Sequence, residues 1–142
     1  MSYGSGSPLV VDTSAWARQH HHSIRERWRE AATANLLVSC PVVALELLTV
    51  ARSADEYDRL DIALRALAQA PVTANVCAAA LAASRSVVNS AEHRRVPAAD
   101  YLIAAAAAAR GCAVLHYDHD YDALAGPLGI ESVWIAPPGS LP

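Results

Sequence analysis

The stretch Leu9-Val10-Val11-Asp12-Thr13-Ser14 joins a short apolar run to three polar residues. The apolar run predicts a buried strand at residues 9–11. A carboxylate that follows such a strand points into the crevice where open α/β sheets bind their ligands. Asp12 is therefore a candidate functional residue. Asp, Thr and Ser are also frequent at helix N-termini, so the alternative is that Asp12 only caps the next helix.

Length and composition favour a single domain. The chain has 142 residues, 54% of them hydrophobic, which is enough for one core. We expect a flexible lead over residues 1–8, one domain over residues 9–136 and a tail over residues 137–142. The lead does not resemble a signal peptide, and the most apolar run is too short to cross a membrane. Three widely spaced cysteines favour neither a zinc site nor a disulfide framework. These features predict a cytoplasmic protein with no membrane anchor.

The net charge of -3 would ordinarily argue against a nucleic-acid partner. However, all 11 basic residues are arginines, which suit phosphate recognition. If five of the 14 acids form one site, the remaining nine are outnumbered by the arginines. An RNA-contacting rim is the functional interpretation of these arginines, and the alternative is an ordinary solvated surface. The candidate rim residues are Arg25, Arg29, Arg94 and Arg95.

Apolar periodicity and capping residues predict the remaining elements. Strands are expected at residues 9–11, 36–39, 71–73, 112–117 and 129–135. Helices are expected at residues 15–34, 41–52, 53–69, 75–93, 97–110 and 121–125. This alternation of strands and helices predicts an α/β sandwich around a mostly parallel sheet.

Glu46 and Asp100 are charges on apolar helices. Valine and leucine surround Glu46 on nearly all sides, which predicts a buried helix and therefore a nearby cation. A salt bridge to Arg52 or to another arginine is the alternative explanation. Asp100 shares its face with Ile103 and alanines, although a first-turn carboxylate is also favoured by the helix dipole.

The stretch Asp118-His119-Asp120 follows another apolar strand. Its alternating acids suggest a calcium loop, but Ala123 stands where such a loop needs glycine and Gly129 where it needs glutamate. We therefore expect Asp118 to end a strand, as Asp12 does, and Asp120 to cap the short helix that follows.

Acids from strand ends and helix starts can thus meet at one edge of the sheet. A cluster of carboxylates without organised His or Cys ligands selects hard cations, Mg²⁺ or Mn²⁺. Such ions suit phosphodiester hydrolysis, because they activate water and neutralise phosphate charge.

The order of these motifs resembles the PIN-domain ribonucleases, in particular the VapC toxins of bacterial type II toxin–antitoxin systems. The motifs are Val11-Asp12-Thr13-Ser14, Glu46 in an apolar helix, Ala99-Asp100 before an alanine-rich helix, and Tyr117-Asp118-His119-Asp120-Tyr121. The resemblance covers Leu9 to Ile135. It implies a PIN-like three-layer α/β/α sandwich and a metal-dependent endoribonuclease that cleaves single-stranded or looped RNA.

The resemblance also assigns roles and partners. It implies that Asp12, Glu46, Asp100 and Asp118 bind the metal, that Asp120 is a fifth acid, and that Thr13 is the polar residue beside the first. Tyr121 stands where the family often has Phe, a departure expected to have no catalytic effect. A homodimer and a VapB-type antitoxin that inserts a basic side chain into the acid pocket are also implied.

Two other kinds of function use similar features. A metal-dependent phosphatase acting on a small substrate would use comparable acids, but it should carry a Gly-rich phosphate loop, and none follows Asp12. A non-catalytic PIN-like module that binds RNA or protein would keep the fold with a broken acid set, whereas this acid set is complete.

Overall fold

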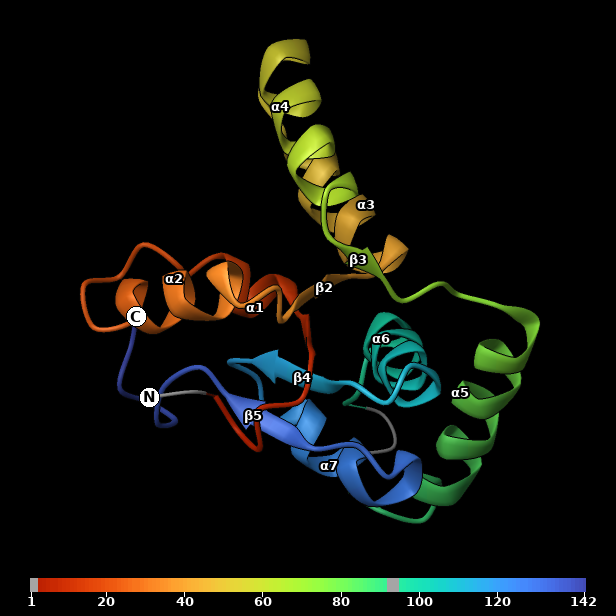
Figure 1. Cartoon of the computed structure of the whole chain (residues 1–142). Coiled ribbons are helices and arrows are strands. Elements are labelled where there is room, and N and C mark those ends of the chain that lie inside the picture. Colours follow the sequence, from red (N-terminus) through yellow and green to blue (C-terminus); the bar gives the residue numbers. More distant parts are fainter. Residues whose placement is uncertain (1–2, 92–94) are drawn as a thin grey trace.

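The computed structural model describes residues 3–91 and 95–142. Within these residues it contains a five-stranded sheet in the order β3-β2-β1-β4-β5, with every neighbouring pair parallel. This arrangement confirms the predicted α/β fold with a parallel sheet (Figure 1). The strands are β1 Leu9–Val11, β2 Leu37–Ser39, β3 Ala68–Gln69, β4 Ala113–His116 and β5 Ser132–Trp134.

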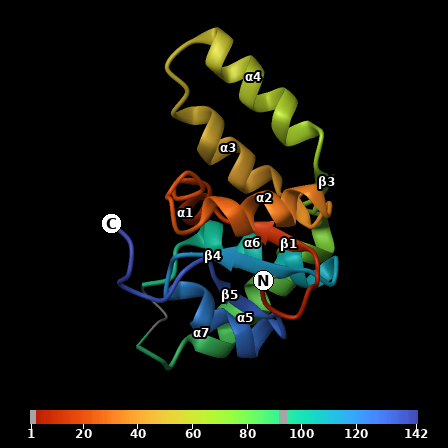
Figure 2. The same cartoon turned by 60° about the vertical axis from the view of Figure 1, so that its left-hand side comes forward.

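Helices cover both faces of the sheet. On one face lie α1 and α2, and on the other lie α5, α6 and α7 (Figure 1). The hairpin of α3 and α4 projects from the body in both views (Figures 1 and 2). The helices are α1 Thr13–Trp16, α2 Arg25–Thr33, α3 Pro41–Thr49, α4 Ala54–Arg65, α5 Ala74–Val87, α6 Ala98–Ala109 and α7 Asp120–Leu128.

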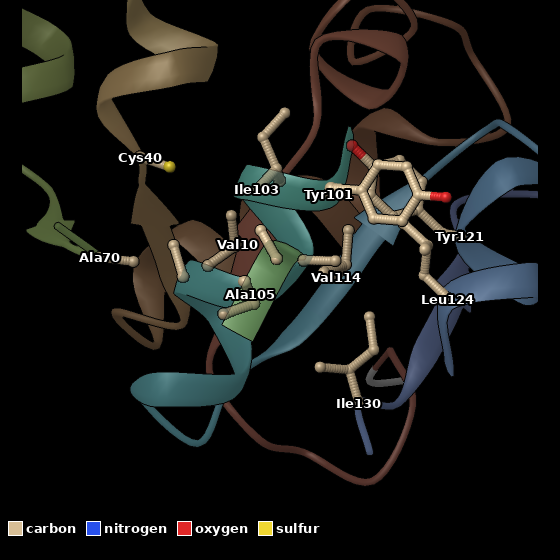
Figure 3. Close-up of a cluster of buried hydrophobic side chains, with 14 of the residues drawn as sticks. Val10, Cys40, Ala70, Tyr101, Ile103, Ala105, Val114, Tyr121, Leu124 and Ile130 are labelled. Carbon is tan, nitrogen blue, oxygen red and sulfur yellow. The ribbon is translucent and has the colours of Figure 1, made fainter. Parts of the chain in front are cut away.

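The strands β1, β2 and β4 are buried on both sides, because helices cover both faces of the sheet and successive side chains point to opposite faces. Val10 and Val114 pack with α5, α6 and α7, and Figure 3 shows part of this cluster. Leu9, Val11 and Leu115 pack with α1 and α2. The two apolar layers therefore fix the register of β1 and β4.

Several predicted elements differ from the structure. The expected helix at residues 15–34 is split into α1 and α2, and in the turn between them the His21 ring nitrogen Nδ1 accepts the N–H of Ser23. The expected strand at residues 71–73 is wrong. The strand β3 lies earlier, and Pro71 has no N–H to donate to a sheet. Helix α7 runs three residues beyond its predicted end at residue 125. Helices α3, α4 and α5 end at residues 49, 65 and 87, before their predicted ends at residues 52, 69 and 93. Of these predicted ends, residue 93 lies outside the described residues.

The first described residues and the C-terminal residues both contact the domain. Tyr3 is buried beneath the Arg27 guanidinium, and Ser5 donates a hydrogen bond to Glu131. The described part of the lead, residues 3–8, is therefore tied to the domain rather than free. At the other end, the Tyr117 hydroxyl donates to the Leu141 carbonyl at 3.2 Å. None of the described helices is long and apolar enough to cross a membrane.

Candidate active site

Asp12 follows β1 and caps α1. Its Oδ2 accepts the backbone N–H of Ser14 at 3.0 Å and also the Ser14 hydroxyl. The Ser14 oxygen in turn accepts the N–H of Tyr117, just beyond β4, at 2.9 Å. Because β1 and β4 are parallel neighbours, their carboxyl ends meet at one edge of the sheet. Asp12 is thus both a helix cap and part of this edge.

Three further acids meet at the same edge. Asp100 lies in the first turn of α6, Asp118 follows β4, and Asp120 begins α7. Each of these three offers a carboxylate oxygen, and these oxygens lie within 4.8 Å of one another. Asp118 Oδ1 accepts the Asp120 N–H at 2.9 Å. Asp120 is the first residue of α7, and His119 occupies the N-cap position without a side-chain capping bond. The predicted capping role of Asp120 is wrong.

The Tyr121 hydroxyl connects Asp12 to this cluster. It donates to Asp12 Oδ1 at 2.7 Å and lies 3.4 Å from Asp100 Oδ1. The structure therefore brings Asp12, Asp100, Asp118 and Asp120 into one acidic pocket.

Glu46 lies outside that cluster. It is exposed rather than buried, and its Oε1 accepts the Thr13 hydroxyl at 3.0 Å. The predicted burial fails because α3 belongs to the projecting hairpin and covers the domain with one face only. The neighbouring Leu45 is 65% exposed and Val50 is 73% exposed. The Thr13 bond nevertheless keeps Glu46 beside the residue that follows Asp12.

The crowding of carboxylates changes their protonation. Burial, and then the negative charges of Asp12, Asp118 and Asp120, raise the pKa of Asp100 to about 8. Burial and the charge of Asp118 also raise the pKa of Asp120, and the nearby Arg95 opposes that rise. Asp100 is only 8% exposed, and its Oδ2 has no hydrogen-bond partner among the described residues. In the metal-free protein, Asp100 therefore tends to stay neutral at neutral pH.

The donor set fits a hard cation. Carboxylate oxygens are the ligands that Mg²⁺ and Mn²⁺ prefer, and no other protein donor type belongs to the clustered set. The partnerless Oδ2 of Asp100 is a buried acceptor of the kind that a cation satisfies. The residues present are therefore suited to a divalent metal.

Sequence reasoning missed three polar residues that support the acids: Ser14, His116 and Tyr121. His116 is completely buried, and its Nδ1 accepts the Asp118 N–H. A histidine inside an otherwise apolar strand, two residues before an acid, was the available signal. For Ser14, its place two residues after Asp12 was a similar signal.

The candidate RNA-contacting arginines divide into groups. Arg25 and Arg29 are exposed on α2. Arg95 is also exposed, and it lies close enough to the acidic pocket for its positive charge to lower the pKa of Asp120. Arg94 lies outside the described residues. These positions do not test RNA contact, so the RNA-contacting rim stays a prediction.

Comparison with known proteins identifies the family. Residues 9–127 match the PIN domain family. The chain is 41% identical to Ribonuclease VapC18 of Mycobacterium tuberculosis over 135 residues, covering 94% of this chain and 98% of that protein. It is 34% identical to Ribonuclease VapC51 of the same organism, over 93% of this chain and 96% of that protein.

Two solved structures share the fold. One is a DNA-bound VapBC from Salmonella typhimurium, with a TM-score of 0.69 and 15% identity, covering 92% of this chain and 99% of that chain. The other is VapBC-5 from Mycobacterium tuberculosis, with a TM-score of 0.62 and 23% identity, covering 90% and 98%. The sequence relatives go further than the shared fold: this chain belongs to the PIN-domain family and, within it, to the VapC ribonucleases.

Proposed function

We propose that this protein is a Mg²⁺-dependent endoribonuclease, the toxin of a type II toxin–antitoxin system, which hydrolyses phosphodiester bonds in single-stranded or looped RNA. One observation carries this proposal. Clustered carboxylates stand at the carboxyl edge of the sheet in a chain that is 41% identical to a ribonuclease. Open α/β sheets bind their ligands at that edge.

The chain's own residues would divide the work between holding the ion and facing the substrate. Asp12, Asp100, Asp118 and Asp120 would hold Mg²⁺, with Mn²⁺ able to replace it. Glu46, exposed and held by Thr13, would contact the ion through water at the pocket's margin. When bound, the ion supplies an activated water and neutralises negative charge on the phosphate. Arg95, near Asp120, would contact the phosphate backbone.

Two protein partners belong to the proposal. The structural neighbours are VapBC assemblies, which supports a VapB-type antitoxin as the inhibitor of this chain. A homodimer is supported by large apolar side chains that are exposed on the projecting hairpin, since such patches mark protein interfaces. These side chains are Leu45, Val50, Tyr57 and Ile62.

The proposed function is tested by RNA cleavage. With Mg²⁺, the wild-type protein should cleave single-stranded or hairpin RNA, and EDTA should abolish cleavage. Asp12→Asn keeps the shape of the side chain but removes its charge. It should lower the cleavage rate on the order of 10³-fold, because the ion supplies several kcal/mol to the transition state. Circular dichroism should show that the fold persists.

Other outcomes identify the alternatives. Cleavage that survives both EDTA and Asp12→Asn would sink the metal mechanism. So would a cyclic 2′,3′-phosphate product, because the RNA's own hydroxyl would then have attacked. Hydrolysis of a small phosphate ester without RNA cleavage would indicate a phosphatase. RNA binding without hydrolysis would indicate a non-catalytic module.

A further inference from the structure

The Tyr121 side chain holds a polar group deep inside the domain. It is 0% exposed and lies among the apolar side chains that pack against the sheet (Figure 3). Its ring lies 5.0 Å from the His116 ring. The hydroxyl reaches Asp12 Oδ1 at 2.7 Å and stands 3.4 Å from Asp100 Oδ1. A single buried hydroxyl thus lies between two carboxylates of the acidic pocket.

The hydrogen bonds of Asp12 show what this hydroxyl does. A carboxylate has about four acceptor positions, two on each oxygen. The Ser14 N–H and hydroxyl both donate to Oδ2, and Tyr121 donates to Oδ1. About one acceptor position is therefore left, on Oδ1. Donors on both oxygens also prevent the carboxylate from turning about its bond to the side chain.

We propose that Tyr121 is a positioning residue, whose hydroxyl holds the Asp12 carboxylate so that Oδ1 presents its remaining acceptor position to the bound divalent ion. This inference rests on the proposed function, because it concerns the same metal-binding pocket. It differs from the expectation that a tyrosine in place of phenylalanine has no catalytic effect. Phenylalanine would fill the same space but would leave Asp12 Oδ1 without its buried donor.

The choice of ion gives a signature that a purely structural role lacks. Mg²⁺ requires near-ideal octahedral geometry, whereas Ca²⁺ accepts irregular coordination. A carboxylate that has lost its orientation should therefore weaken Mg²⁺ binding more than Ca²⁺ binding. General loosening of the pocket would weaken the binding of both ions alike.

The test is calorimetric titration of Mg²⁺ alone, and of Ca²⁺ alone, into the full-length protein without RNA. Tyr121→Phe should weaken Mg²⁺ binding about 10- to 100-fold, the usual effect of removing a group that orients a metal ligand. The loss for Ca²⁺ should be clearly smaller. Tyr101→Phe is the matched control, because Tyr101 is also buried and its hydroxyl has no partner among the described residues. It should leave the affinities for both ions unchanged.

Kinetics supply a second measurement. At limiting Mg²⁺, Tyr121→Phe should lower kcat without changing KM for RNA, and saturating Mg²⁺ should restore much of the rate. Wild-type Mg²⁺ affinity in Tyr121→Phe would overturn the positioning role while leaving the proposed function intact. Equal losses for Mg²⁺ and Ca²⁺ would overturn it in favour of a structural role. A wild-type protein that neither binds Mg²⁺ nor cleaves RNA would overturn both proposals.

Discussion

The backbone N–H of Asp118 donates to Nδ1 of the buried His116 ring at 3.1 Å. Because Nδ1 is the acceptor, the ring proton of the neutral histidine is assigned to Nε2, which lies 2.7 Å from the Ser132 hydroxyl oxygen. Ser132 then donates to Asp122 Oδ1 at 2.7 Å. Neutral His116 thereby fixes the start of the loop that carries Asp118 and Asp120.

This arrangement predicts a loss of stability in acid. Burial lowers the pKa of His116 from 6.5 to about 4. Between these values the unfolded chain binds a proton that the folded protein does not bind. The free energy of unfolding should therefore fall as the pH falls from 6.5 to about 4, by at most about 1.4 kcal/mol per pH unit. Protonation would also place an N–H on Nδ1, facing the Asp118 N–H.

In the wild-type protein, Asp100 masks this loss of stability. Because the pKa of Asp100 is raised, its contribution to the free energy of unfolding increases as the pH falls over the same range. Urea unfolding should therefore be followed in the Asp100→Asn background, without metal. Adding His116→Asn should flatten the acid slope of that background. A slope that stays the same would show that another group causes it.

Above pH 6.5, Asp100 dominates in the metal-free protein. Its pKa is about 8 in the folded state and 3.8 in the ordinary case. The folded protein thus keeps a proton that the unfolded chain has released. Stability should be lost as the pH rises from 6.5 to about 8, again by at most about 1.4 kcal/mol per pH unit. Thermal unfolding in EDTA measures this slope.

Two conservative variants identify which carboxylate causes the loss of stability between pH 6.5 and about 8. Asp100→Asn should remove most of it and raise the melting temperature near pH 8, because it takes a charge out of the crowded pocket. Glu46→Gln should do neither, since Glu46 is exposed and lies outside the cluster. Similar gains from both variants would show that Glu46 shares the repulsion. No gain from Asp100→Asn would mean that the carboxylates do not repel as argued.

The sequence could predict those acids of the site that directly follow an apolar strand. Apolar runs ending at Val11 and His116 mark the carboxyl ends of neighbouring parallel strands, so Asp12 and Asp118 had to approach each other. The burial of Glu46 could not be judged in the same way. An apolar helix shows that its surface needs covering, but not whether the same chain or a partner covers it.

The supporting hydrogen bonds lay beyond sequence reasoning for a different reason. The Tyr121 hydroxyl meets Asp12 across 109 positions of the chain, and His116 meets Ser132 across 16. Such contacts depend on tertiary packing rather than on local pattern. The split of the expected helix at residues 15–34 is likewise set by local side-chain bonds, which compete with helical hydrogen bonds.

His119 lies between two of the acids in sequence, but we expect it not to act as a general base. Its exposed ring packs against Trp134, with ring centroids 4.8 Å apart. The metal itself lowers the pKa of the attacking water. His119→Ala should therefore cost less than about tenfold in kcat, whereas a general base typically contributes about 10²- to 10⁴-fold. A larger loss, with unchanged Mg²⁺ affinity, would make His119 part of the proton transfer.

The arginine rim is tested by the salt dependence of RNA binding. Arg25, Arg29 and Arg95 are exposed, and Arg95 is close enough to act on Asp120. Each alanine variant, with Arg94→Ala alongside, should weaken binding to single-stranded RNA. The slope of log affinity against log salt should flatten by about 0.7 per lost phosphate contact. Mg²⁺ affinity should change little. Arg65→Ala is the control, because Arg65 already pairs with Asp61 on α4 at 3.0 Å. If the slopes of all four rim variants match that control, these arginines serve the surface or the antitoxin rather than RNA.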